Sequence, residues 1–159
     1  MKKLYISTLV VLLLLIVAST TFAALAAGER QLPLKGSVDA TETQQVVFPL
    51  NNIHVTGSGN ATQLGKFTYS LQAVLHIPTL SATSTATIVA ADGSSLFAAG
   101  TGQGTPTVTP GIISIVETLT ITGGTGRFEG ASGNITIQRL VNRATLASSG
   151  TISGIIVLP

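Results

Sequence analysis

The sequence predicts an all-β domain that closes into a small antiparallel barrel, and three observations support that prediction. Apolar and polar side chains alternate with a period of two through most of the chain after residue 27. No window in that part shows the 3.6-residue period of an amphipathic helix. Turn signals divide the alternation into about seven or eight short strands, which is typical of barrels and sandwiches. A barrel is favoured because closure removes edge strands, and these strands carry too little charge to protect open edges.

The first 26 residues predict a signal peptide. A basic head, Met1-Lys2-Lys3, precedes an apolar run over residues 4–18, and small residues then lead to Ala24-Leu25-Ala26, a pattern that signal peptidase cleaves. The predicted organisation is a signal peptide at 1–26 and one barrel domain at 27–159, in a secreted or periplasmic location. The alternative is an uncleaved anchor, since residues 4–27 are long enough to span a bilayer. After cleavage we expect no membrane attachment, and a lipid cannot be attached through cysteine because the chain has none.

The charge of the predicted mature chain argues against nucleic-acid binding. The full chain has 8 Lys and Arg against 6 Asp and Glu. Lys2 and Lys3 lie in the leader, so the basic and acidic residues that follow are equal in number. Neutralising phosphates requires a basic patch, and none is expected here. Absent cysteine also excludes disulfides and thiolate chemistry, so the domain must be held together by core burial, which its size permits.

The individual strands follow from the alternation. In residues 66–77, Phe67, Tyr69 and Leu71 share one face with Ala73, and the other face is polar except for Val74. Pro78 ends that strand because it has no N–H to donate. Residues 81–91 repeat the pattern, and Asp92-Gly93 predicts a two-residue hairpin turn. Further strands are predicted at residues 34–41, 43–55, 94–100, 112–122, 133–142 and 146–158, with a loop at 100–111.

A glycine-dense turn near the C-terminus carries a family resemblance. The segment Thr122-Gly123-Gly124-Thr125-Gly126-Arg127-Phe128-Glu129-Gly130, between two alternating strands, resembles the allene oxide cyclase barrel family and, more loosely, the dirigent proteins. The resemblance implies an eight-stranded antiparallel barrel and, from the assemblies of those families, a homodimer or homotrimer. The plant cyclases use an early-strand glutamate, asparagines and a cysteine. This chain has no cysteine, and Glu42 is only a poor match to the glutamate, so the activity is not carried over.

Two charged residues fall in phase with apolar neighbours. Glu117 shares the face of Ile115 and Leu119, and Arg139 shares the face of Ile137. A hairpin centred on Phe128 pairs Glu117 with Arg139 and matches every apolar residue to an apolar one. The sequence therefore predicts an ion pair inside the barrel. Three interpretations stay open: a structural pair that fixes the register, a polar spot in a ligand cavity, or a catalytic acid or base at Glu117.

The main functional prediction is an exported barrel that binds a small apolar or amphipathic molecule without transforming it. The predicted ligand-binding residues are Glu117, Arg139, Tyr69 and Phe67. One alternative is an isomerase or cyclase acting on a small lipid-like or phenolic substrate, with Glu117 as acid–base group. Another is a structural or surface-associated protein whose barrel is filled.

No cofactor and no metal are predicted. His54 and His76 have no clustered acidic partners, so they do not resemble metal ligands. Glu129 stands where a dinucleotide-binding fingerprint needs its last glycine, and a strand rather than a helix is expected to follow.

Overall fold

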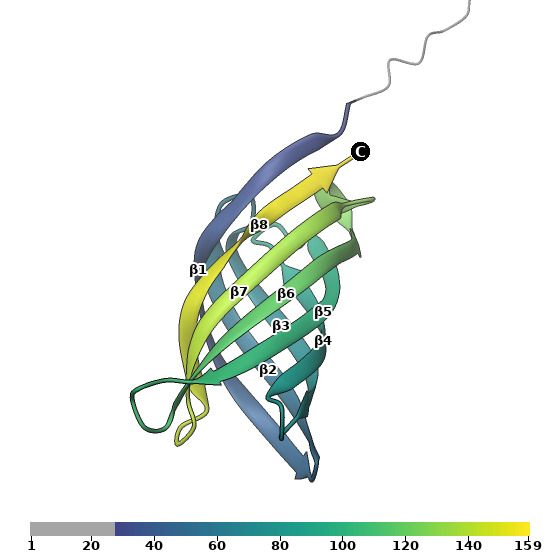
Figure 1. The fold of residues 1–159 in the computed structure, drawn as a ribbon. Helices are drawn as coiled ribbons and strands as arrows, with labels where there is room; N and C mark the ends of the chain where they lie inside the picture. Colours follow the sequence, from purple (N-terminus) through teal and green to yellow (C-terminus); the bar gives the residue numbers. More distant parts are fainter. Residues whose placement is uncertain (1–27) are drawn as a thin grey trace, which may run out of the picture.

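The protein is a closed barrel of eight antiparallel strands (Figure 1). The computed structural model describes residues 28–159, so the predicted signal peptide lies outside the described residues. Each strand pairs with its sequence neighbours, and β1 closes the ring against β8. The predicted fold class is confirmed. The elements are β1 (Arg30–Val47), β2 (Leu50–Ala61), β3 (Gly65–His76), β4 (Ser81–Val89), β5 (Ser95–Pro106), β6 (Ile112–Gly124), the 3-10 helix η1 (Gly126–Phe128), β7 (Ser132–Asn142) and β8 (Ala147–Leu158).

Two predicted strand boundaries are wrong. The expected break near residue 42 is absent from the described chain, because β1 runs on to Val47 and the turn falls at Phe48 and Pro49. The polar run after Thr41 belongs to the strand because Glu42 finds charged and polar partners inside the barrel. The predicted loop at 100–111 is also too long, since β5 continues to Pro106 and pairs with β6 over this stretch. The sheet needs Gly100 there, because a Cβ at that position would lie 2.0 Å from the carbonyl oxygen of Thr118.

The predicted register of the β6–β7 hairpin is wrong by two residues. Glu117 lies opposite Ile137, and Arg139 lies opposite Ile115. The connection contains η1, so the centre of the hairpin does not fall on Phe128. A shift of two residues keeps every side chain on its predicted face, because side chains alternate with a period of two. Glu117 and Arg139 therefore still point into the barrel, as diagonal rather than direct neighbours.

One half of the barrel interior is filled by apolar side chains. At the end that holds the C-terminus, Leu64 from the β2–β3 connection and Phe128 from η1 are each only 1% exposed. Towards the middle, Val38, Leu71 and Leu119 are equally well buried. This packing closes one end of the barrel and gives the domain its core.

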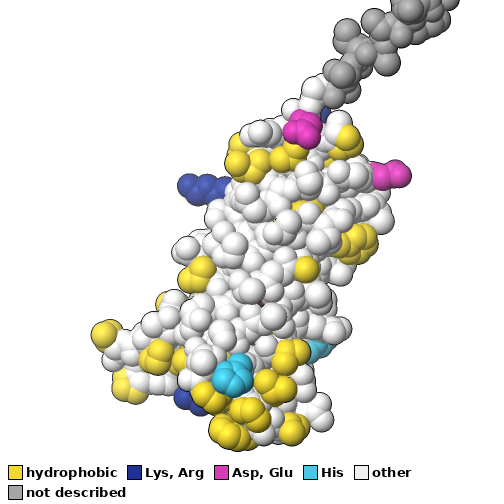
Figure 2. Space-filling model, turned by 45° about the vertical axis from the view of Figure 1, so that its right-hand side comes forward, with side chains coloured by type: hydrophobic (Ala, Val, Ile, Leu, Met, Phe, Trp, Pro, Cys, Tyr) yellow, Lys and Arg dark blue, Asp and Glu magenta, His cyan; other side chains and the backbone are white. Residues whose placement is uncertain are grey.

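The opposite end carries the turns between β1 and β2, β3 and β4, β5 and β6, and β7 and β8. Apolar side chains are exposed there at the β1–β2 tip, with Phe48 76% exposed and Val47 64% exposed. Figure 2 shows hydrophobic side chains gathered at this lower end of the molecule, while the acidic side chains visible on this face lie at the other end. Within the described residues, no helix is long and apolar enough to cross a membrane.

Candidate functional site

The candidate site is a cavity of about 470 Å³ inside the half of the barrel away from the C-terminus. Small inward residues create it. Along β5 the inward positions shrink from Leu96 through Ala98 to Gly100, Gly102 and Gly104. Facing strands add Ala73 and Ala82, and the walls also contain apolar side chains from β2, β3 and β6, namely Ile53, Leu75, Ile113 and Ile115. One alternative drawn from the sequence supposed a filled barrel. The cavity shows that the barrel is not filled throughout.

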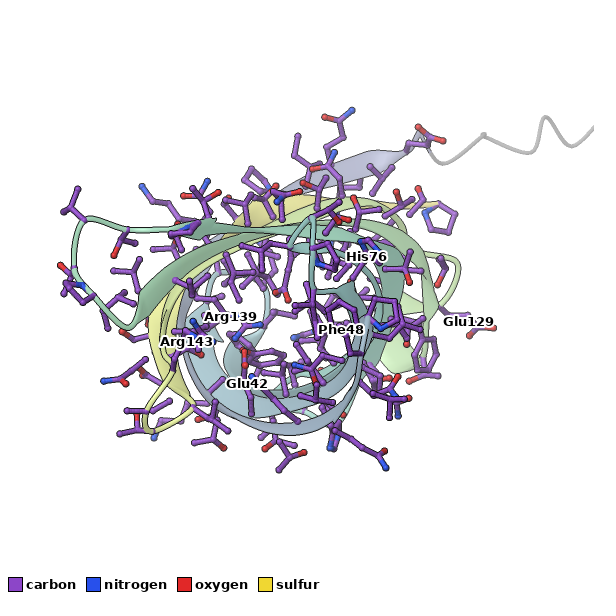
Figure 3. All side chains as sticks on the ribbon, turned by 60° about the horizontal axis from the view of Figure 1, so that its bottom comes forward. Glu42, Phe48, His76, Glu129, Arg139 and Arg143 are labelled. Carbon is purple, nitrogen blue, oxygen red and sulfur yellow. The ribbon has the colours of Figure 1, made fainter. Side chains whose placement is uncertain are left out.

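A buried cluster of three charges lies in the lining of this cavity. The Arg139 guanidinium, from β7, lies between the carboxylates of Glu42 on β1 and Glu117 on β6. Its Nη2 donates to Glu117 Oε1 at 3.1 Å and its Nε to Oε2 at 3.5 Å, while its Nη1 donates to Glu42 Oε1. Arg139, Glu42 and Glu117 are 4%, 5% and 3% exposed. Figure 3 shows Glu42 and Arg139 pointing toward one another inside the ring of strands.

Barrel closure brings Glu42 to this cluster. Glu42 is 97 residues away from Arg139 in sequence. The two strands that carry them are separated by β8, which pairs with both. From β8, the Ser148 hydroxyl accepts a hydrogen bond from Arg139 Nη1 at 3.2 Å. The guanidinium therefore reaches across one strand to meet a carboxylate on the next.

A chain of amide hydrogen bonds extends the cluster toward the open end of the barrel, which is the end that carries the β1–β2 turn. Gln44 Nε2 donates to Glu42 Oε2 at 3.2 Å, and Asn51 Nδ2 donates to Gln44 Oε1 at 3.1 Å. This orientation of both amides follows from Glu42, because an ionised carboxylate only accepts hydrogen bonds. The Oδ1 atom of Asn51 is left buried with no hydrogen-bond partner among residues 28–159. Asn51 itself is 5% exposed and lines the cavity.

The low-polarity interior shifts two pKa values. Burial lowers the pKa of Arg139, but the neighbouring carboxylates of Glu117 and Glu42 together raise it by more, so the guanidinium stays charged. Burial raises the pKa of the Tyr69 phenol to about 12, and the negative charges of Glu117 and Glu42 add to the effect while Arg139 opposes it. In the described part of the chain the Tyr69 hydroxyl also has no hydrogen-bond partner.

The structure brings together only some of the predicted site residues. Glu117 and Arg139 form the predicted interior ion pair and line the cavity. Phe67 and Tyr69 are buried in the barrel interior, but neither is among the described residues that line the cavity. Sequence reasoning missed the role of Glu42. The signal was available, because Glu42 is in phase with the inward residues Val38 and Ala40, but the strand was expected to end before it.

The histidines lie apart from this site. His54 Nε2 is hydrogen-bonded to the half-buried Ser70, and His76 Nδ1 to the exposed Thr79. Across residues 28–159, no group of three or more metal-ligating side chains is placed to hold a metal ion.

Comparisons with known proteins give a match at the level of structure. No family model matches the chain, and no curated protein matches it by sequence. A solved structure, that of the pterocarpan synthase dirigent protein GePTS1, superposes with a TM-score of 0.58 over 90% of this chain and 98% of that chain. The chain has a dirigent-like fold. At 12% identity the match shows the fold alone, and at that level it confirms the predicted resemblance.

The dirigent-like barrel of this protein combines features suited to a small amphipathic molecule. The cavity walls are largely apolar, and apart from Gln103 and Arg143 the polar side chains of the lining belong to the Arg139 cluster and the adjoining amides. A ligand could bury an apolar body against the walls and direct a polar group at the charges. Such a combination is typical of small-molecule sites.

Proposed function

We propose that this protein binds a small amphipathic molecule inside the barrel without transforming it, and that it does so outside the cytoplasm. The observation that carries the proposal is the cavity of about 470 Å³, which lies within the range of roughly 300–1,000 Å³ of small-molecule sites. The buried charges favour a binding role over a purely structural one. They lie at the boundary between the packed half and the hollow half of the barrel, where a bound molecule would meet them.

The proposal is tested by blocking the cavity without disturbing the charges. A Cβ at Gly104 would make ordinary contacts, 3.4 Å from Leu80 Cβ and 3.5 Å from Ile113 Cγ2. Gly104→Val therefore fits the strand and extends two methyl groups into the cavity. The matched control is Thr101→Val, on the exposed outer face of the same strand.

The measurement is mass spectrometry of small molecules that co-purify with the native protein and with both variants. We expect a defined molecule with the native protein and with Thr101→Val, and its loss from Gly104→Val. A molecule retained equally by Gly104→Val would place its binding elsewhere. No retained molecule, together with no binding of added amphiphiles, would contradict the proposal.

A second candidate is an isomerase or cyclase, and the placement of Glu117 favours it. Its carboxylate is held by the Arg139 guanidinium at the wall of an apolar cavity, as a positioned acid or base requires. The structurally similar dirigent protein is described as a pterocarpan synthase, which is an enzymatic activity of that protein. Conversion of the retained molecule by the native protein, abolished in Glu117→Gln, would establish the enzyme. Recovery of that molecule unchanged would support binding alone.

Two further expectations are part of the proposal. We propose export by cleavage after Ala26, which N-terminal sequencing of the secreted protein would test. We also propose assembly as a homodimer or homotrimer, which light scattering coupled to size exclusion would test. A monomer at micromolar concentration would contradict the assembly but not the binding role.

A further inference from the structure

The charge of the cavity indicates the class of ligand. Resting on the proposed binding role, we infer that the ligand carries a cationic or donor-rich head, such as a primary ammonium group, seated against Glu42 and Glu117. Its apolar body would lie along the cavity walls toward the open end.

The buried charges of the cluster do not balance. The cluster contains two carboxylates and one guanidinium, and all three side chains are more than nine-tenths buried. The ionised cluster therefore has one surplus negative charge in an interior that does not favour isolated charges. A bound cation would neutralise it, whereas a carboxylate ligand would double it.

Arg143 also lines the cavity, but its side chain is exposed at the rim. Water screens a charge there far more than one beside Arg139. The other described residues of the lining carry no formal charge. The deep end of the cavity therefore remains negative.

The hydrogen-bond donors and acceptors of the cluster do not balance either. Arg139 has five N–H groups, and it already makes hydrogen bonds to both Glu117 oxygens, to Glu42 and to Ser148. Little donor capacity is left for an anion. Each carboxylate oxygen of Glu42 and Glu117 accepts one hydrogen bond, from either Arg139 or Gln44. A second lone pair on each oxygen therefore remains for a donor on the ligand.

An independent observation points the same way. Asn51 Oδ1 is buried and accepts no hydrogen bond from any residue that the structure describes, although Asn51 lines the cavity. A buried carbonyl oxygen without a partner is unfavourable. An N–H or O–H group of a ligand in the cavity would satisfy it. From the charged cluster to Asn51, acceptors thus outnumber free donors in this part of the cavity lining.

The test compares three probes that share a tail and differ in the head: decylamine, decanol and decanoate. Each is titrated into the native protein at pH 7 by calorimetry, below its aggregation concentration. We expect decylamine, charged at this pH, to bind at least about tenfold more tightly than decanol, because charge-assisted hydrogen bonds are the stronger ones. Decanoate should bind most weakly. Gly104→Val should weaken all three, which locates binding in the cavity.

Two variants assign the preference to the cluster. Glu42→Gln removes the surplus charge, so in this variant the affinity for decylamine should fall to about the affinity for decanol. If that variant does not fold by circular dichroism, Asn51→Ala serves instead, with a several-fold loss for the two probes whose heads carry a donor, decylamine and decanol. Arg143→Gln is the control for a rim charge and should not weaken decylamine binding.

The outcomes separate this inference from the proposed function. Equal binding of decylamine and decanol would overturn the inference of a cationic ligand head, while the proposed binding role would stand. Tighter binding of decanoate would also overturn it, and would show that Arg139 receives an anion. No binding of any probe would overturn both.

Discussion

Removal of the Arg139 guanidinium is the most informative perturbation of the fold. In Arg139→Met the side chain keeps a similar length but no longer bonds to Glu42, Glu117 and Ser148. Two carboxylates, 5% and 3% exposed, are then left in the interior without their cation. Breaking a buried pair in this way destabilises proteins by about 3–5 kcal/mol, which is roughly a 150- to 5,000-fold increase in the unfolding equilibrium constant.

Urea denaturation followed by far-UV circular dichroism measures the effect. With a slope of roughly 1–3 kcal/mol per molar urea, the midpoint should fall by about 1 M or more. Arg143→Gln is the matched control, because Arg143 is exposed just beyond the same strand, and it should change stability by less than about 0.5 kcal/mol.

A triple variant isolates the charge from the shape. Adding Glu42→Gln and Glu117→Gln to Arg139→Met removes all three charges, and we expect much of the lost stability to return. A loss of stability below about 1 kcal/mol in Arg139→Met alone would contradict this prediction. It would show that water reaches the guanidinium and that the cluster behaves as a surface ion pair.

Three more predictions follow from the structure. Burial raises the pKa of Tyr69 to about 12, so its contribution to stability is fully present below pH 10 and is lost as the pH rises toward 12, by about 1.4 kcal/mol per pH unit at most. Urea midpoints of the native and Tyr69→Phe proteins should therefore diverge between pH 10 and 12 in favour of the variant, and parallel curves would contradict the shift. At pH 7, Tyr69→Phe should be neutral or slightly stabilising in the same assay, because it removes a buried hydroxyl that no described residue bonds. Gly100→Ala should destabilise the protein by about 1–3 kcal/mol in thermal unfolding, since the new methyl group would lie 2.0 Å from a backbone oxygen of β6. An unchanged melting temperature would show that the two strands separate easily.

Much of the fold was predictable from the sequence by itself. The period of two identified strands, and low charge favoured closure over open edges. Alternation also placed Glu117 and Arg139 on the inner face, and this survived an error of two residues in the hairpin register because the face depends only on odd or even position.

The composition of the site, by contrast, depends on contacts between strands that are distant in sequence. Glu42 joins Arg139 because β1 and β8 close the ring, a pairing between the two ends of the domain that no local pattern specifies. The hairpin register depended on η1, whose backbone path cannot be read from alternation. The cavity arises from residues of several strands together, among them Ala73, Ala82, Gly102 and Gly104. Alternation says which side chains face inward, whereas the space left between them depends on which strands stand opposite one another.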